Sequence, residues 1–354
     1  MNNSPTELSV SVIVPVYNGG ENFRLCLECL KNALPRPAEI IVVADGDTDG
    51  SWQLARAFGC RVLRLPSPGG PARARNMGAR SAEGEILFFV DADVMVPPDA
   101  LRHVTTAFER EPYLAAIFGS YDEQPGEPNF LSQYRNLLHH YVHQTGREEA
   151  STFWGACGAI RREVFLALSG FDEQYVRPSI EDIEFGHRLK RAGYRIRLRK
   201  ELQVKHLKQW NFISMVRTDF FVRALPWTAL ILRDRLFIND LNIGMSGRAS
   251  VMLLFLLLGS LLLSFWQPLA LVGTSVMVLI LVMLNAPLYR FFLRKRGIRF
   301  TIQSLPFHWL YFFYSGVAFA VGTMRHLVSY DPSPGSLSLI KEQASTESHR
   351  ERRK

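Results

Sequence analysis

Residues 11–20 read SVIVPVYNGG, a β-branched apolar run that ends in a turn of Asn and Gly. Such a run predicts a buried strand followed by a loop. The same arrangement returns at residues 39–50, EIIVVADGDTDG, and at residues 85–93, EILFFVDAD. Helical patterns separate and follow these runs, at residues 22–34, 51–58 and 71–82. This alternation predicts an α/β fold with a mostly parallel sheet and helices on both faces.

A long apolar segment follows the predicted α/β domain. The chain has 354 residues, 47% of them hydrophobic, and it carries no Asp, Glu, Lys, Arg or His from Ala249 to Tyr289. As a helix this stretch would extend about 60 Å, twice the ~30 Å hydrocarbon thickness of a bilayer. Gln267 and Pro268 interrupt it near the middle. The pattern therefore favours a transmembrane hairpin, at about 249–266 and 269–289, over a buried helix pair in a soluble domain.

The charge distribution predicts how this hairpin is oriented. The net charge is +8, and five cations without an acid follow the second apolar segment, within residues 290–299. Loops rich in Lys and Arg stay on the cytoplasmic side of a membrane. We therefore expect an integral membrane protein whose N-terminal domain is cytoplasmic. Because the cations cluster beside apolar segments, they favour contact with lipid head groups over nucleic acid.

The predicted organisation has four parts. Residues 1–210 form the α/β domain, and residues 211–247 form amphipathic helices at the membrane interface. Residues 248–330 form the transmembrane region, and residues 331–354 form a disordered basic tail. Within the transmembrane region, the weakly charged segment at about 302–324 predicts either a third span or a re-entrant or interfacial helix.

Polar side chains follow the predicted strands where those strands end. Asp91 and Asp93 form a D-x-D turn, and two carboxylates spaced in this way can hold one Mg²⁺ or Mn²⁺ ion. Asp45, at the end of a neighbouring strand, can accept a hydrogen bond from a base or a ribose. Arg75 and Asn76, on the following helix, can donate to a phosphate or a carboxylate. In a parallel sheet these strand ends meet at one edge, where ligands bind.

Further candidate residues lie later in the chain. Asp182, next to Glu181 at a predicted helix start, suits a general base, although a helix N-cap is a rival interpretation. His206 follows a basic strand and could be a further metal ligand or simply end the domain. His139, His140 and His143 resemble a cluster of metal ligands, with His139 and His143 at i, i+4. No acidic or cysteine partner accompanies them, which favours an ordinary polar helix face over a metal site.

Residues 188–208 form a strongly basic strip. They include nine cations and one acid, Glu201. A solvated surface and contact with a membrane or an anionic ligand are both consistent with this composition.

The order of seven motifs is specific for a family. They are SVIVPVYNGG, VADGDTDGS, GGPARARNMG, FFVDAD, WGACGAIRREVF, GFDE and EDIEFGHRLKRAGY. Across about residues 8–206 the chain strongly resembles the family 2 glycosyltransferases. The resemblance implies a GT-A fold and a nucleotide-diphosphate sugar as donor, with a preference for uridine. It also implies transfer with inversion at the anomeric carbon.

The resemblance also implies roles for individual residues. The donor would contact Pro15, Tyr17, Asp45, Arg75, Asn76 and Asp91. The divalent cation would be bound by Asp91 and Asp93, with His206 as the additional candidate, and Asp182 matches the catalytic base. Ala44 stands where the family often has a second acid, so Asp45 would act alone.

The acceptor is inferred from the remaining features. The Gln-x-x-Arg-Trp motif of processive polysaccharide synthases is absent from the sequence, which favours transfer of one sugar per encounter. The apolar hairpin and the basic strip favour a membrane lipid or lipid-linked hydroxyl acceptor. Transfer to a polyprenyl phosphate is the alternative within the family. A metal-dependent nucleotidyltransferase and a non-catalytic sugar-nucleotide sensor are alternatives from other classes.

Overall fold

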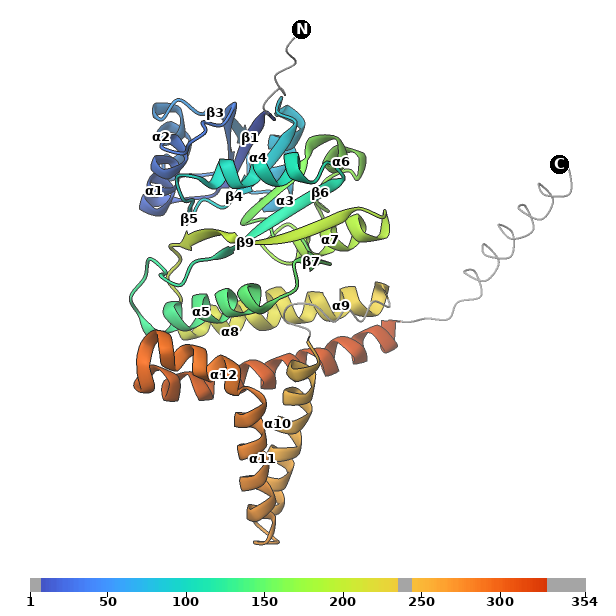
Figure 1. The fold of residues 1–354 in the computed structure, drawn as a ribbon. Helices are drawn as coiled ribbons and strands as arrows, with labels where there is room; N and C mark the ends of the chain where they lie inside the picture. The colour runs from blue at the N-terminus through green and yellow to red at the C-terminus, as the bar shows by residue number, and fades with distance from the viewer. Residues whose placement is uncertain (1–7, 235–243, 330–354) are drawn as a thin grey trace, which may run out of the picture.

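A nine-stranded sheet forms the centre of the globular part of the computed structural model, which describes residues 8–234 and 244–329 (Figure 1). The strand order is β3-β2-β1-β4-β8-β6-β9-β5, and β7 pairs with β9. The strands are β1 (Val10–Val16), β2 (Glu39–Asp45), β3 (Arg61–Leu65), β4 (Ile86–Val90), β5 (Val94–Met95), β6 (Leu114–Tyr121), β7 (Glu149–Ala150), β8 (Cys157–Arg161) and β9 (Arg195–His206). The α/β fold predicted from the sequence is confirmed.

The sheet has a parallel half and a mixed half. Strands β1 to β4 are parallel to one another, as the sequence predicts. Strand β8 runs antiparallel to both β4 and β6, while β6 and β9 are parallel. The short strands β5 and β7 both pair antiparallel with β9. The carboxyl ends of β1, β2 and β4 therefore meet at one edge.

Helices cover both faces of the sheet. The helices on one face are α1 (Gly20–Lys31), α2 (Ser51–Ala57) and α4 (Ala100–Arg110), and those on the other are α3 (Pro71–Ser81), α6 (Arg162–Ala167) and α7 (Glu181–Arg191). Alternate side chains of β1 point to opposite faces. Val12 and Val14 accordingly pack with Phe23 of α1, whereas Ile13 packs with Ala72 of α3.

Aromatic packing joins β4 to the helices α6 and α7. Phe89 of β4 is fully buried, and its ring lies 5.2 Å from that of Phe165 and 5.3 Å from that of Phe171. Phe185 of α7 lies 5.1 Å from both of these rings. This cluster holds the start of α7 close to the end of β4.

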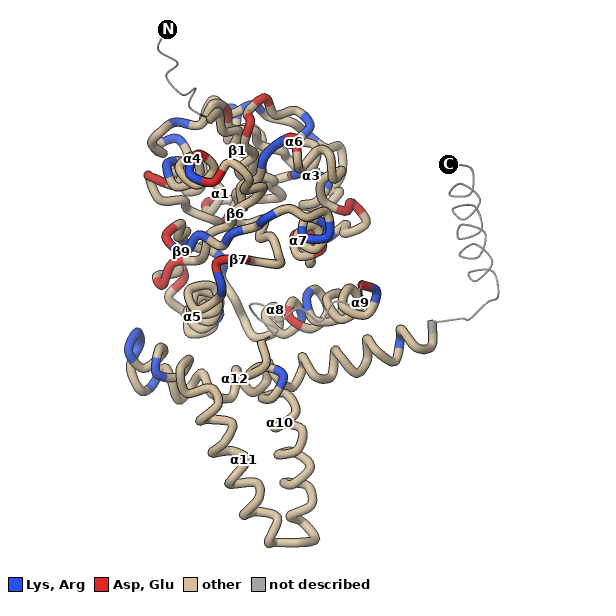
Figure 2. The backbone as a smooth tube through the Cα atoms, turned by 45° about the vertical axis from the view of Figure 1, so that its right-hand side comes forward, with Lys and Arg blue, Asp and Glu red and all other residues tan. Residues whose placement is uncertain are grey.

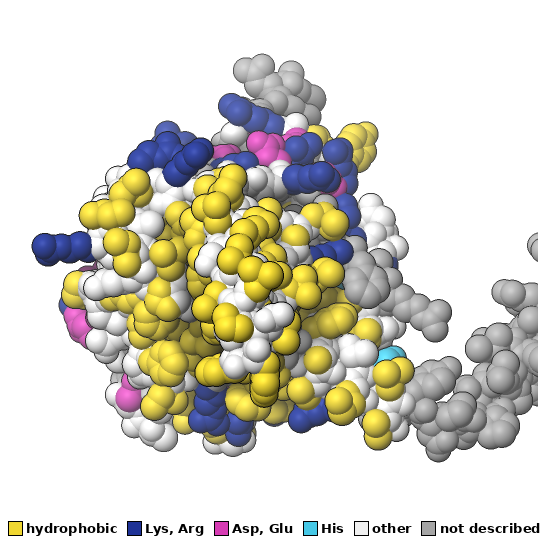
Figure 3. Space-filling model, turned by 90° about the horizontal axis from the view of Figure 1, so that it is seen from below, with side chains coloured by type: hydrophobic (Ala, Val, Ile, Leu, Met, Phe, Trp, Pro, Cys, Tyr) yellow, Lys and Arg dark blue, Asp and Glu magenta, His cyan; other side chains and the backbone are white. Residues whose placement is uncertain are grey.

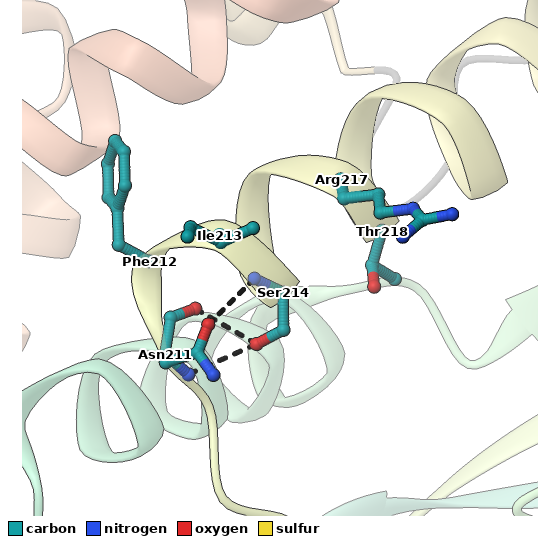
Figure 4. Close-up of a pocket in the computed structure, with 6 residues that line it drawn as sticks. All are labelled: Asn211, Phe212, Ile213, Ser214, Arg217 and Thr218. Atoms are coloured by element: carbon teal, nitrogen blue, oxygen red, sulfur yellow. Dashed lines mark hydrogen bonds between the residues drawn. The ribbon is translucent and has the colours of Figure 1, made fainter.

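A layer of helices lies beneath the sheet (Figure 1). It comprises α5 (Phe130–Thr145), α8 (Phe212–Arg217), the π-helix η1 (Thr218–Ala224) and α9 (Leu225–Asp234). Helix α8 begins with a capping box, in which Asn211 and Ser214 each accept the other's backbone N–H (Figure 4). Phe212 points toward α12, where its ring lies 6.4 Å from that of Phe307. Residues 235–243 of the predicted interfacial segment lie outside the described residues.

The apolar segment forms a hairpin that projects from the globular part (Figures 1 and 2). Helices α10 (Met245–Leu263) and α11 (Ala270–Leu284) pack side by side, and α12 (Ala286–Ser329) then bends away by 65°. By length and composition, α10 alone could cross a membrane, or two segments could if the bent pair α11 and α12 is counted as one. The bend falls at Asn285, whose side chain donates to Ser250 Oγ and to the carbonyl of Leu281, each at 2.9 Å.

Helix α12 is broken at Gly297, which has a φ of +79°, and its second part crosses the base of the globular part rather than following the hairpin (Figure 1). It contains the predicted segment 302–324 and packs against α9 and α10 (Figure 1). Gly316 permits one close approach, because a Cβ atom there would lie 2.3 Å from the ring of Phe255. The depth of these helices in a membrane stays a prediction, as do the domain boundaries. The predicted tail at 331–354 lies outside the described residues.

The basic segment of α12 just before the break at Gly297 contacts the globular domain. Arg296 donates to the carbonyl of Glu123 at 2.7 Å and to the side chain of Gln133 at 3.0 Å. Lys295 forms an ion pair with the Glu123 carboxylate. The end of the apolar hairpin is therefore tied to the globular domain, and the start of α10 lies at the base of the globular part as well (Figure 1).

The underside of the molecule is strongly apolar. Seen from below, hydrophobic side chains cover its centre and Lys and Arg side chains lie toward its rim (Figure 3). At the tip of the hairpin, Phe265 and Trp266 are 79% and 80% exposed. An apolar surface of this kind, rimmed by polar residues, marks a site that contacts a membrane or another protein.

We predict that Phe89→Ala destabilises the globular domain by about 3–5 kcal/mol, since it opens a cavity within the aromatic cluster. The measurement is a denaturant titration followed by circular dichroism, with Tyr113→Ala as the control. Tyr113 is 91% exposed, so its removal should change stability little. Equal losses in the two variants would contradict this account of the core.

Candidate active site

Three predicted donor-binding residues lie at one edge of the sheet. In the register of β1 and β2, Pro15 pairs with Val43 and Val16 pairs with Ala44. Tyr17 and Asp45, the next residues along each strand, are therefore neighbours at the carboxyl edge. The Tyr17 side chain is 57% exposed there, so its ring is free to stack on a planar ligand.

Asp45 organises the loop in front of α3. Its two carboxylate oxygens accept the backbone N–H groups of Gly69 at 2.7 Å and Gly70 at 2.9 Å. Gly70 has a φ of +89°, and a Cβ atom there would lie 2.6 Å from the carbonyl oxygen of Val176. Each of these oxygens retains a second lone pair, which can still accept a hydrogen bond from a base or a ribose. The contact between Asp45 and the donor stays a prediction.

Arg75 lies buried between two acids. It donates to Asp91 Oδ1 at 2.6 Å and to Glu181 Oε1 at 3.0 Å, and only 4% of the residue is exposed. Burial disfavours the charged guanidinium, but Asp91, Glu181 and Asp182 outweigh burial and raise the pKa of Arg75. Arg75 thus joins the end of β4 to the start of α7. The sequence did not indicate that Glu181 pairs with Arg75, although its adjacency to Asp182 indicated an acidic site.

Both the amide nitrogen and the amide oxygen of Asn76 form hydrogen bonds within the protein. Its amide nitrogen donates to the carbonyl of Phe171 at 2.8 Å and to Glu173 at 3.0 Å. Its amide oxygen accepts the N–H of Phe171 at 2.9 Å. Asn76 therefore holds the loop before α7, and its contact with a diphosphate stays a prediction.

Asp182 lies in the first turn of α7. Ile180 is the N-cap of this helix, so the rival interpretation of Asp182 as the N-cap is wrong. Its carboxylate accepts the backbone N–H of Gly155 at 3.0 Å and that of Ile183 at 2.8 Å. Burial and then the charge of Glu181 raise the pKa of Asp182 to about 6, although both N–H groups and Arg75 oppose the shift. A carboxylate with this pKa suits a general base near neutral pH.

Strand pairing places His206 beside the D-x-D turn. Val94 of β5 pairs with His206 of β9, and the N–H of Leu207 donates to the carbonyl of Asp93 at 2.9 Å. His206 Nε2 lies 3.6 Å from Asp93 Oδ2. Burial opposes ionisation of Asp93, but His206 and Lys208 outweigh it and lower the pKa of Asp93.

The predicted metal ligands fit a divalent cation by donor type. Asp91 and Asp93 are about one third exposed, at 32% and 34% of their side chains. Carboxylate oxygens suit Mg²⁺ and Mn²⁺, and the imidazole of His206 is a further donor. Within residues 8–234 and 244–329, however, no three His, Cys, Asp or Glu side chains already converge on one point. The metal site therefore stays a prediction.

His206 packs against a cluster of aromatic side chains. The ring of Tyr121 stacks on that of His206, with centroids 4.4 Å apart, and meets Trp154 edge-on at 4.8 Å. His139 lies 4.9 Å from Trp154 and 4.1 Å from His143. Burial, followed by the charge of His143, lowers the pKa of His139 well below its usual value. The prediction of an ordinary polar helix face is therefore wrong, because these rings pack inward.

The basic strip is paired with acids of the same domain. Glu111 forms an ion pair with Arg197, with 3.0 Å between Oε2 and Nε, and its Oε1 accepts a hydrogen bond from Arg199 at 2.6 Å. Glu149 pairs with Lys190 at 2.8 Å. These contacts, which the sequence did not predict, engage much of the strip in structural ion pairs.

Family models match the same part of the chain. The model described as "Glycosyl transferase family 2" matches residues 11–168, and that described as "N-terminal domain of galactosyltransferase" matches residues 136–210. Together they extend from β1 to the end of the globular domain.

Individual relatives agree with these matches. Glycosyltransferase GlyG of Streptococcus pneumoniae is 32% identical over 34% of this chain and 42% of its own length. The uncharacterized glycosyltransferase YibD of Escherichia coli is 40% identical over 30% of this chain and 31% of its own. The chain thus spans less than half of these two relatives. A mannosyltransferase from Pyrobaculum calidifontis, solved with GDP-Man and Mn²⁺, shares the fold with a TM-score of 0.51 at 16% identity, over 89% of this chain and 88% of its own.

We predict that Arg75→Met destabilises the domain by roughly 3–5 kcal/mol, because it leaves the Glu181 carboxylate buried without its cation. The double variant Arg75→Met/Glu181→Gln should recover a large part of this loss. Denaturation midpoints measure both effects, with Arg73→Met as the control on the exposed side of α3. No recovery in the double variant would mean that the ion pair does not couple these residues.

Proposed function

The chain belongs to the family 2 glycosyltransferases, and we propose that it transfers one sugar from a nucleotide-diphosphate sugar to a lipid or lipid-linked hydroxyl. The observation that carries this proposal is the convergence of Asp91, Glu181 and Asp182 around the buried Arg75. This arrangement unites the D-x-D turn of a GT-A domain and a candidate base with raised pKa in one site.

The donor fits the carboxyl edge of the sheet. The exposed ring of Tyr17 offers a stacking surface for the nucleoside, beside Pro15 and Asp45. The Pyrobaculum mannosyltransferase, solved with GDP-Man and Mn²⁺, supports a sugar-nucleotide donor and a divalent cation for this fold. We favour a uridine nucleotide. Held by Asp91 and Asp93, with His206 as a further ligand, the cation would supply positive charge against the leaving diphosphate.

Asp182 is the proposed general base. Its two oxygens accept backbone N–H groups and keep lone pairs for a substrate proton. The acceptor O–H gives its proton to Asp182 while the oxygen forms a bond to the anomeric carbon. The bond from that carbon to the diphosphate oxygen breaks, and the diphosphate leaves with the electron pair. Attack from the face opposite the leaving group inverts the anomeric carbon.

A membrane location of the acceptor is supported by the apolar hairpin. Its tip exposes Phe265 and Trp266, and both of its ends lie beside the globular domain (Figure 1). We propose that the hairpin anchors the protein in the membrane and that the domain acts at its inner, cytoplasmic face. A base with raised pKa favours a hydroxyl over an already ionised polyprenyl phosphate as the attacking group.

The direct test incubates the purified full chain with Mn²⁺, membrane lipid extract and a panel of nucleotide sugars. Release of nucleoside diphosphate, with a glycosylated lipid as product, supports the proposal. Release of nucleoside monophosphate and pyrophosphate would instead identify a nucleotidyltransferase. Donor binding without any turnover would identify a sugar-nucleotide sensor.

We predict that Asp182→Asn lowers turnover by at least about 100-fold, since it removes the proton acceptor, while the donor dissociation constant changes little. Isothermal titration with the nucleotide sugar measures binding, and diphosphate release measures turnover. Asp172→Asn, in the exposed loop before α7, is the matched control. Turnover at the parent rate in Asp182→Asn would rule out this base.

The raised pKa of Asp182 predicts a pH dependence. The residue acts as a base only when it is ionised, so turnover should fall about tenfold per pH unit below a pH near 6. Glu181→Gln removes a negative charge that raises this pKa, so it should move the acid limb to lower pH. The measurement is the pH profile of kcat; an acid limb that stays in place in Glu181→Gln would contradict the assignment.

A further inference from the structure

A cavity of about 1040 Å³ lies between the globular domain and the apolar helices. It is lined from one end by Tyr121 and His206 of the active site and from the other by Phe255 of α10 and Phe319 of α12. Its volume is at the upper end of the ~300–1,000 Å³ range of small-molecule sites. It therefore connects the proposed metal ligand His206 with the proposed membrane region.

The lining of the cavity is cationic. Four arginines line it: Arg135, Arg147, Arg223 and Arg248. Asp219 is the single acid among the described lining residues, and it already accepts from Arg135 at 2.6 Å and from the Tyr314 hydroxyl. The structure shows no ion pair or hydrogen bond between Arg223 or Arg147 and the described residues. The cavity thus retains positive charge that an anionic group would neutralise.

Arg223 lies near the catalytic end of this cavity. Burial dominates the lowered pKa of His139, and the charges of His143 and Arg223 add to the shift. His139 touches Trp154, and the next residue, Gly155, donates its N–H to Asp182. A group bound by Arg223 therefore lies beside the cluster that adjoins the proposed base.

The opposite end of the cavity opens between apolar helices. Met252 and Phe255 of α10 line it and are 68% and 40% exposed, and Phe319 of α12 is 43% exposed. Side chains that both line a cavity and remain exposed mark its opening. A hydrocarbon chain can enter there from the apolar underside (Figure 3).

We propose that this cavity binds the acceptor, and that the acceptor is a lipid with a phosphate-bearing head group. The phosphate lies against Arg223, the hydrocarbon chain lies between α10 and α12, and the attacking hydroxyl reaches Asp182 past Tyr121 and Trp154. This inference rests on the proposed glycosyltransferase function and names the chemical class of its acceptor.

The test uses native mass spectrometry of the full chain in detergent, titrated with dioleoyl phosphatidic acid. Dioleoylglycerol is the phosphate-free match, and glycerol 3-phosphate is the chain-free match. We expect one phosphatidic acid to bind roughly tenfold or more tightly than either match, because hydrogen bonds to charged groups contribute most. Equal binding of phosphatidic acid and dioleoylglycerol would contradict the role of the phosphate. Glycerol 3-phosphate binding as tightly as phosphatidic acid would contradict the role of the lipid chain.

Arg223→Gln should abolish the preference for phosphatidic acid. Arg102→Gln, an exposed cation on α4 outside the cavity, is the matched control and should keep it. Melting curves establish that both variants are folded. An unchanged preference in Arg223→Gln, or an equal loss in both variants, would overturn the assignment.

Failure of this inference can be distinguished from failure of the proposed function. Asp182→Asn should bind phosphatidic acid as the parent does, because it leaves the cavity lining unchanged. If the parent binds this lipid selectively but releases no diphosphate from any nucleotide sugar, the glycosyltransferase function is wrong. If it turns over without selective lipid binding, only the acceptor assignment is wrong.

Discussion

The candidate active site depends on one buried guanidinium. Arg75 requires its two acidic partners, because an unpaired charge in the interior is strongly destabilising. Its bonds to Asp91 and Glu181 therefore fix the end of β4 relative to the start of α7, two elements far apart in the chain. The position of Asp182 follows from this constraint, since it is the residue next to Glu181. The same cation opposes the raised pKa of Asp182 without reversing it.

A second buried charge connects the catalytic domain to the apolar helices. Asp219 of η1 accepts from Arg135 of α5 and from Tyr314 of α12. One carboxylate thus joins two helices of the layer beneath the sheet to the helix that crosses its base. π-Helical turns are rare and occur frequently at functional sites. Here the π-helix also carries Arg223, which lines the cavity. The element that bonds to α5 and α12 through Asp219 therefore also contributes a cation to the cavity lining.

The sequence predicted the local elements better than it predicted their partners. The strand at residues 85–90 and the D-x-D turn after it could be predicted from the sequence, because an apolar, β-branched segment followed by acidic residues is a local pattern. His139 and His143 show the opposite case. Their i, i+4 spacing fits an exposed face equally well, and only the neighbouring Tyr121 and Trp154 determine that they face inward. Cations of the basic strip likewise pair with Glu111, which is distant in sequence.

The amino-acid sequence by itself determined the parallel half of the sheet, the apolar hairpin and the position of the acidic motifs. Side-chain periodicity and hydrophobicity act over a few residues, so these properties can be read without a structure. The tertiary structure alone decided that Glu181 pairs with Arg75, that β5 and β9 bring His206 to Asp93, and that α12 closes a cationic cavity. Such pairings depend on the packing of segments that are far apart in the chain. The sequence around one of these side chains does not reveal which partner it will meet.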